Sequence, residues 1–171
     1  TKKVIDNAPK LKHISRVGIG LDSVDLLAAR DKKIRVSYTP DAPAPAVAEL
    51  TIGLMLSLLR GIHISNADLH KGIWKRHFGR RISEITIGVI GMGRIGTRVL
   101  RRLKSFGTPR ILVNDVLPNL ELNREFKLEW VSKDVIYKEC DLISLHVPMT
   151  PRTKGMIGVN EFSMMKKNAL L

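Results

Sequence analysis

The residues that decide the fold are 91–96, GMGRIG, because of what lies on either side of them. Residues 85–90, ITIGVI, precede them as a short apolar run rich in β-branched side chains, which is typical of a buried parallel strand. After the glycines, apolar side chains recur at helical spacing as far as Phe106, and Gly107 with Pro109 predicts the end of a helix. A glycine-rich turn between a buried strand and a helix indicates a phosphate-binding loop.

A second strand and an acidic residue complete the pattern. Residues 111–113, ILV, predict the strand, and Asp115 follows it about 20 residues after the last glycine of the motif. An acid at this spacing accepts hydrogen bonds from ribose hydroxyls in dinucleotide-binding βαβ units, and it repels a 2′-phosphate. The pattern therefore predicts a βαβ unit that favours NAD over NADP. The alternative is a glycine-rich turn of some other α/β fold.

Each glycine of the motif has its own chemical reason. Gly91 allows the tight turn out of the strand, and Gly93 lets the backbone approach a pyrophosphate with no Cβ in the way. Gly96 lets the helix pack closely on the sheet. The helix N-terminus offers N–H groups and a partial positive charge, and Arg94 adds a charge-assisted hydrogen bond.

Length and composition indicate one or two small globular domains. The chain has 171 residues, of which 44% are hydrophobic, and no apolar run approaches the roughly 20 residues that span a bilayer. We therefore expect no membrane span, and the mixed N-terminal segment predicts no secretory signal. The single cysteine, Cys140, excludes an internal disulfide and a cysteine-cluster metal site, and it fits a reduced, cytoplasmic compartment.

The formal charge of +13 allows two interpretations. One is a polyanionic partner, and the other is a solvated surface with affinity for phosphorylated small molecules. Only 5% of the residues are aromatic, and they do not alternate with basic residues as a single-strand platform would require. We therefore expect no nucleic-acid partner.

The hydrophobic pattern predicts alternating strands and helices along the whole chain. A proline-rich stretch at residues 39–45 predicts an extended turn, and a long helix that is apolar nearly all round follows it, which predicts burial between domains or subunits. The predicted strands are 11–17, 34–38, 85–90, 111–113 and 141–147, with another beginning at 169–171, and the predicted helices are 24–30, 46–69, 95–106, 132–139 and 160–167.

Several segments together resemble the D-isomer-specific 2-hydroxyacid dehydrogenases, especially the D-3-phosphoglycerate dehydrogenase-like members. The resemblance covers almost the whole chain. Its motifs are SRVGIGLDSVD at residues 15–25, AVAELTIGL at 46–54, GIW at 72–74, the glycine fingerprint at 88–96 and CDLISLHVPMT at 140–150.

The resemblance implies a Rossmann-type parallel-sheet cofactor domain plus part of a flavodoxin-like substrate domain, both incomplete. Residues 1–70 would form the partial substrate domain with the interdomain helix, and residues 71–171 the NAD-binding domain, truncated at its C-terminal side. The arginine, glutamate and histidine that the family uses on its substrate would lie beyond Leu171. We therefore expect no catalytic residue among these 171, and no turnover by this part of the enzyme alone.

The resemblance also implies a substrate site in the N-terminal part. The backbone N–H groups of Gly18, Ile19 and Gly20 would face the substrate carboxylate, and Ile19 would approach the nicotinamide. Arg16 would lie near the substrate, where its planar guanidinium suits a carboxylate or phosphate. The alternative for Arg16 is a surface arginine at the end of a strand.

The cofactor site implied by the resemblance lies at the carboxyl ends of the later strands. His146 would be a wall residue of the crevice and not the general base. The residues would be Gly91, Gly93, Arg94, Ile95 and Gly96 on the pyrophosphate, Asp115 on the ribose, and Ile19, His146, Val147, Pro148 and Thr153 around the nicotinamide and adenine.

The function implied is hydride transfer between NAD and a D-2-hydroxy acid or its 2-oxo acid. The charge and Arg16 favour a phosphorylated substrate such as 3-phosphoglycerate. The resemblance also implies a homodimer formed through the cofactor domain and the long helix. The alternative is an NAD-sensing binding protein of the co-repressor type, against which residues 15–18 and 146–148 favour an enzyme.

Other polar and aromatic residues are expected to be structural. Asp25 should cap the following helix, and Cys140 should be a small buried side chain at the start of a strand. Trp74 should pack, and Glu49 should act as a charge near a helix start, with a domain-hinge contact as the alternative. The histidines, including His77, show no spacing that predicts a metal site or a carboxylate partner.

Overall fold

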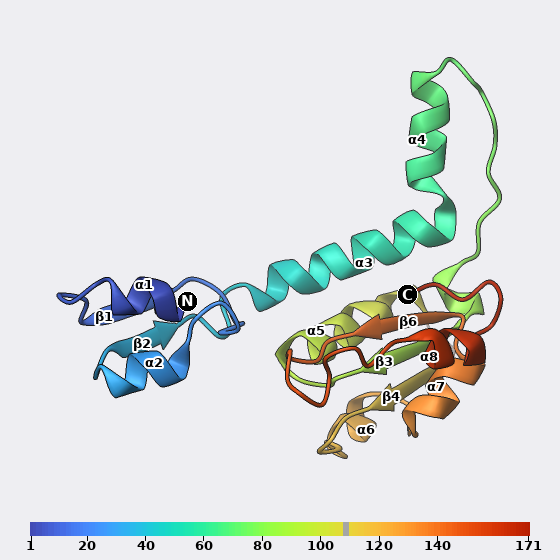
Figure 1. The fold of residues 1–171 in the computed structure, drawn as a ribbon. Helices are drawn as coiled ribbons and strands as arrows, with labels where there is room; N and C mark the ends of the chain where they lie inside the picture. The colour runs from blue at the N-terminus through green and yellow to red at the C-terminus, as the bar shows by residue number, and fades with distance from the viewer. Residues whose placement is uncertain (108–109) are drawn as a thin grey trace.

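Two α/β units are joined by a long helix in the computed structural model, which describes residues 1–107 and 110–171 (Figure 1). The N-terminal unit is small and lies apart from the larger C-terminal one. The predicted helix end at Gly107 is confirmed, because this residue has a left-handed φ of +66°. The predicted role of Pro109 lies outside the described residues.

The N-terminal unit is a two-stranded parallel sheet with two short helices. Its elements are α1 (Lys2–Asp6), β1 (His13–Arg16), α2 (Leu26–Asp31) and β2 (Arg35–Tyr38). Ile14 of β1 is paired with Val36 of β2. The predicted cap is confirmed, because the N–H of Ala28 donates to the Asp25 carboxylate at 2.9 Å. The unit buries few side chains, among them Ile5 and Ala29.

The C-terminal unit is a four-stranded parallel sheet in the order β5-β4-β3-β6. Its elements are a 3₁₀ turn η1 (Ile82–Glu84), β3 (Thr86–Ile90), α5 (Arg94–Leu103), a 3₁₀ turn η2 (Lys104–Phe106), β4 (Arg110–Asn114), α6 (Leu122–Glu125), β5 (Leu128–Trp130), α7 (Lys133–Glu139), β6 (Leu142–Leu145) and α8 (Val159–Met164). Leu142 also forms a parallel bridge with Leu170, where the sequence predicts a further strand.

Both faces of this sheet are buried, as the alternating residues of β4 show. Ile111 and Val113 belong to one cluster with Leu100 of α5, and that cluster also takes in one face of the long helix. Leu112 belongs to the opposite cluster with Ile136 of α7. The continuous apolar strands of the sequence therefore correspond to a sheet covered on both sides, as parallel sheets require.

The prediction of one buried helix over residues 46–69 is wrong in two respects. The structure has two helices, α3 (Ala44–Arg60) and α4 (Ile62–His70), which meet at an angle of 67°. Gly61 adopts a left-handed φ of +63°, which ends α3 as a C-terminal glycine commonly does. α3 buries only one face, α4 has no buried residue, and outward side chains such as Leu50 remain 62% exposed.

Local signals also misplaced some boundaries. The stretch 39–45 was expected to be extended, whereas α3 already begins at Ala44 and includes Pro45 in its first turn. A proline is tolerated there because the N–H groups of the first turn have no partner within the helix. α1, α6 and β5 were not predicted. Each spans five residues or fewer, which is too short for a clear periodicity.

Three expectations for individual side chains are wrong. Trp74 is 86% exposed, because it lies in the segment at residues 71–81, which has no helix or strand and returns from the far end of α4 to the C-terminal unit. Glu49 does not act on its own helix start but accepts from Arg102 of α5 at 2.9 Å, which joins the two helices. His77 does have a carboxylate partner, since its Nε2 lies 2.7 Å from Asp68 Oδ2.

Candidate cofactor and substrate sites

The glycine loop lies at the carboxyl end of β3, beside the end of β6. A Cβ on Gly91 would come within 3.0 Å of the His146 carbonyl oxygen, and the residue has a φ of +96°. A Cβ on Gly96 would come within 3.0 Å of the Gly91 carbonyl oxygen. Gly93, by contrast, has no atom within 4 Å of such a Cβ. Two glycines are therefore required by the fold, and the third faces open space where a ligand could approach closely.

The N-terminus of α5 points into this loop. Gly93 is the N-cap residue and has no side chain to accept from the first-turn amides, so those N–H groups remain available to an anion. The hydroxyl of Thr97 donates to the Met92 carbonyl at 2.9 Å and holds the loop against the first turn. The arrangement suits a diphosphate bound through backbone N–H groups.

Asp115 braces the same loop from the end of β4. Its Oδ2 accepts from the N–H of Met92 at 2.6 Å, and its Oδ1 accepts from the N–H of Leu117 at 3.2 Å. These bonds orient the carboxylate and leave further lone pairs for ribose hydroxyls. The expected ribose ligand is thus also a structural residue of the loop.

Arg94 points toward the segment that precedes α3. Its Nε donates to Asp41 Oδ1 at 2.8 Å, and both side chains are more than half exposed. Two residues earlier, the hydroxyl of Thr39 accepts from the N–H of Gly18 at 2.8 Å. Sequence reasoning missed Asp41 and Thr39, because no local pattern links a turn residue to a helix start 53 positions later.

The loop at residues 18–20 differs from the expected substrate cradle in one respect. The N–H of Gly18 already donates to Thr39, so the amides of Ile19 and Gly20 are the ones left for a carboxylate. The guanidinium of Arg16 folds over this loop and donates to the Val17 carbonyl. Arg16 therefore lies beside the loop, as a substrate-binding residue would, although it also meets the description of a strand-end arginine.

His146 and Val147 continue from β6 against the glycine loop. The N–H of His146 donates to the Ile90 carbonyl at 2.7 Å, and the Val147 side chain lies next to Gly91. The imidazole Nε2 lies 2.9 Å from Ser144 Oγ, and burial lowers the pKa of His146 below its ordinary value. The backbone at 146–147 therefore lies against the glycine loop, with the imidazole on its other side.

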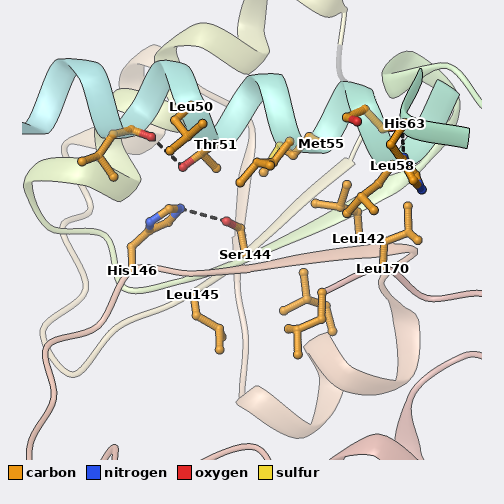
Figure 2. A pocket seen from close by; sticks show the side chains of 15 residues that line it. Leu50, Thr51, Met55, Leu58, His63, Leu142, Ser144, Leu145, His146 and Leu170 are labelled. Atoms are coloured by element: carbon orange, nitrogen blue, oxygen red, sulfur yellow. Dashed lines mark hydrogen bonds between the residues drawn. The ribbon is translucent and has the colours of Figure 1, made fainter. Parts of the chain in front are cut away.

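The side chain of His146 points away from the crevice and toward α3, as Figure 2 shows. It lies with Ser144 and Thr51 at one end of a mainly apolar groove of about 650 Å³ between α3 and β6, and Ser57 and His63 also line this groove. Leu145 points to the opposite side of the strand. The backbone of His146 therefore contacts the glycine loop, whereas its ring lines the groove, and the predicted cofactor contact of His146 stays a prediction.

Pro148 and Thr153 belong to the loop that leaves β6. The hydroxyl of Thr153 donates to the Pro148 carbonyl at 2.5 Å and accepts from the N–H of Thr150 at 2.8 Å. These bonds close the loop on itself. The Thr153 hydroxyl is thus engaged within its own loop, and its predicted cofactor contact stays a prediction.

The strand order and the site together define a class of protein. The chain runs from β3 to β4 and β5 on one side and returns to β6 on the other, so the order reverses between β3 and β6. Open parallel sheets bind ligands at this reversal, and here it carries the glycine loop, the α5 N-terminus and the oriented Asp115. The fold is a Rossmann-type dinucleotide-binding domain, and these residues fit NAD.

Comparison with known proteins extends this conclusion to a family. The model for "D-isomer specific 2-hydroxyacid dehydrogenase, NAD binding domain" matches residues 52–171. The chain belongs to the D-isomer specific 2-hydroxyacid dehydrogenase family and carries its NAD-binding domain. The expected family, fold class and cofactor are therefore confirmed.

Individual relatives have several activities. The chain is 43% identical to the D-3-phosphoglycerate dehydrogenase of Methanocaldococcus jannaschii, with 100% of this chain and 33% of that protein covered. It is 38% identical to the hydroxypyruvate reductase of Thermotoga maritima, with 100% and 55% covered. A structure of Aquifex aeolicus D-lactate dehydrogenase with NAD and lactic acid superposes with a TM-score of 0.87 at 34% identity, covering 99% and 51%. The chain spans one third to just over half of these relatives.

Within residues 1–107 and 110–171, no group of three or more His, Cys, Asp or Glu side chains is arranged to hold a metal ion. Over the same residues, no single helix is long and apolar enough to cross a membrane. α3 and α4 reach that length and apolar composition only when they are taken together, and they are bent by 67° relative to each other.

Proposed function

We propose that these residues form the cofactor half of an NAD-dependent dehydrogenase that acts on a D-2-hydroxy acid. The observation that carries the proposal is the glycine loop, which is braced by Asp115 and open in front of Gly93. The α5 N-terminus and Arg94 would hold the pyrophosphate, and Asp115 the ribose. NAD supplies the hydride acceptor of this reaction. Residues 1–70 would belong to the substrate domain and 71–171 to the cofactor domain.

The first test is calorimetric titration of this chain with NAD. The expected result is that the chain binds NAD and that Asp115→Ala binds it more weakly, because the substitution removes the acceptor for the Met92 N–H and for the ribose. The matched control is Asp134→Ala, which removes a carboxylate from the first turn of α7. Absence of NAD binding by the unsubstituted chain would contradict the proposal.

We further propose that the substrate carries a phosphate, as in 3-phosphoglycerate. The support is the +13 charge, the placement of Arg16 over the Gly18 loop, and the similarity to D-3-phosphoglycerate dehydrogenase. In the intact dehydrogenase, Arg16→Ala should raise the substrate KM about tenfold and leave the NAD KM unchanged. Arg35→Ala is the control, because Arg35 lies at the opposite end of the same strand pair. An unchanged substrate KM for Arg16→Ala would remove this assignment.

A homodimer is proposed on the exposed apolar surface of α4 and the segment after it. Leu69 and Trp74 are 55% and 86% exposed, and α4 buries nothing within the chain. Light scattering should report twice the 19.2 kDa mass of the chain, and Trp74→Glu should return it to 19.2 kDa. Val116→Glu, on an equally exposed residue that follows β4, should keep the dimer. A monomeric unsubstituted chain would contradict the proposal.

We also propose a cytoplasmic location for this enzyme. The support is the single cysteine, Cys140, which is buried and is a free thiol, as in proteins of reducing compartments. A fluorescent fusion of the intact dehydrogenase should be distributed through the cytoplasm.

A further inference from the structure

Residues 39–41 connect the two loops that the proposed function assigns to substrate and cofactor. At one end, the Thr39 hydroxyl accepts from the N–H of Gly18 at 2.8 Å, and the N–H of Thr39 donates to the Gly18 carbonyl at 3.3 Å. At the other end, Asp41 accepts from Arg94 Nε at 2.8 Å. The short stretch before α3 thus contacts the substrate loop through the hydroxyl and the backbone N–H of Thr39, and the cofactor loop through a charge pair.

The geometry of Arg94 makes this contact relevant to ligand binding. Arg94 is the first residue of α5, directly after Gly93, which faces open space. Asp41 engages Nε and leaves the two Nη groups as donors at the outer end of the guanidinium. The Arg94 side chain is 54% exposed, so it loses conformational entropy when it binds a phosphate. Because the bond from Nε to Asp41 already restricts the side chain, less entropy is lost on binding.

We propose that Asp41 is a positioning residue that orients Arg94 toward the cofactor pyrophosphate. The proposal rests on the proposed function, because it needs NAD to bind at the glycine loop. It assigns to Asp41 an effect on cofactor affinity although Asp41 belongs to the stretch before α3, outside the glycine loop. Since the same stretch contacts Gly18, it also links the two loops physically.

Coulomb repulsion alone predicts the opposite effect of removing Asp41 on pyrophosphate affinity, which makes the proposal testable. Asp41 carries a negative charge near a site for an anion, so removing it should tighten pyrophosphate binding if only Coulomb repulsion mattered. If Asp41 positions Arg94, removing it should weaken binding instead. Exposed ion pairs contribute little, so the expected weakening is about threefold.

The experiment compares dissociation constants of this chain for ADP-ribose and adenosine by calorimetry. ADP-ribose carries the pyrophosphate and adenosine lacks it. Asp41→Ala should bind ADP-ribose about threefold more weakly and adenosine as well as before. Asp41→Asn retains an acceptor for Nε and should stay within about twofold of the unsubstituted chain. In an Arg94→Ala background, Asp41→Ala should have no further effect.

A matched charge control separates positioning from a general field effect. Asp31→Ala removes the same charge from an equally exposed residue that is paired with Arg30, and should leave both affinities unchanged. Unchanged or tighter ADP-ribose binding by Asp41→Ala, or an undiminished effect without Arg94, would overturn the positioning role alone. Failure of the unsubstituted chain to bind ADP-ribose and NAD would overturn the proposed function, and the positioning role with it.

Discussion

Alanine at Gly93 and at Gly96 should separate ligand binding from folding, although the two positions are only three residues apart. A Cβ on Gly96 would lie within 3.0 Å of the Gly91 carbonyl oxygen, a backbone atom that no rotamer change can move. Overpacking of this kind costs about 3 kcal/mol, which for a chain of this size lowers Tm by about 6–12 °C. Gly96→Ala should therefore unfold at a clearly lower temperature.

Gly93→Ala should behave in the opposite way. Its backbone, with φ of −75° and ψ of −153°, is accessible to alanine, and no atom lies within 4 Å of the added methyl group. The free energy of unfolding should change by no more than about 1 kcal/mol. The methyl group would occupy the space proposed for the pyrophosphate, so NAD affinity should fall about tenfold to a hundredfold.

Two measurements decide between these expectations. Thermal unfolding followed by circular dichroism reports Tm for both variants, and calorimetric titration reports NAD affinity at a temperature where both are folded. The reasoning would be refuted if Gly93→Ala lowered Tm as much as Gly96→Ala, or if Gly93→Ala bound NAD with unchanged affinity. Either result would mean that the glycine spacing serves packing alone.

Asp115, His146 and Cys140 each allow a further test. Asp115→Ala should shift the ratio of NAD to NADP dissociation constants about tenfold toward NADP, because it removes an acceptor for the ribose and a charge that repels a 2′-phosphate; an unchanged ratio would contradict this. Because burial lowers the pKa of His146, the unfolded chain binds a proton first as the pH falls below the ordinary 6.5. The free energy of unfolding in urea should therefore fall from pH 7.5 to 5.5, and by less in His146→Gln. Burial raises the pKa of Cys140 from 9.0 to about 12, so iodoacetamide at pH 8 should alkylate the thiol only in urea, as mass spectrometry would show. The unfolded thiol ionises first between pH 9 and 12, so stability should also fall across that range.

The sequence alone was sufficient for the βαβ unit around the glycine motif. Its strands were predicted to within about two residues, and the spacing from the glycines to Asp115 indicated the cofactor class. These features are local: β-branched runs, helical periodicity and glycines in a tight turn are set by neighbouring residues. The motifs along the rest of the chain were also sufficient to identify the family, which comparison with known proteins confirmed.

Only the tertiary structure decided how distant segments meet. The break at Gly61 was not predicted, because a glycine within an apolar helical pattern is compatible with a continuous helix. The pairs Arg94–Asp41, Gly18–Thr39 and His77–Asp68 depend on how the units and helices pack.

The orientation of the His146 side chain was likewise not predictable from the sequence. Its motif marks it as part of the crevice, yet successive side chains of a strand point to opposite faces, so the ring faces α3 and only the backbone reaches the glycine loop. Periodicity and spacing act over a few residues, and they determine which element forms. The partner of an exposed side chain is determined by where the elements come to rest, which depends on contacts between residues far apart in the sequence.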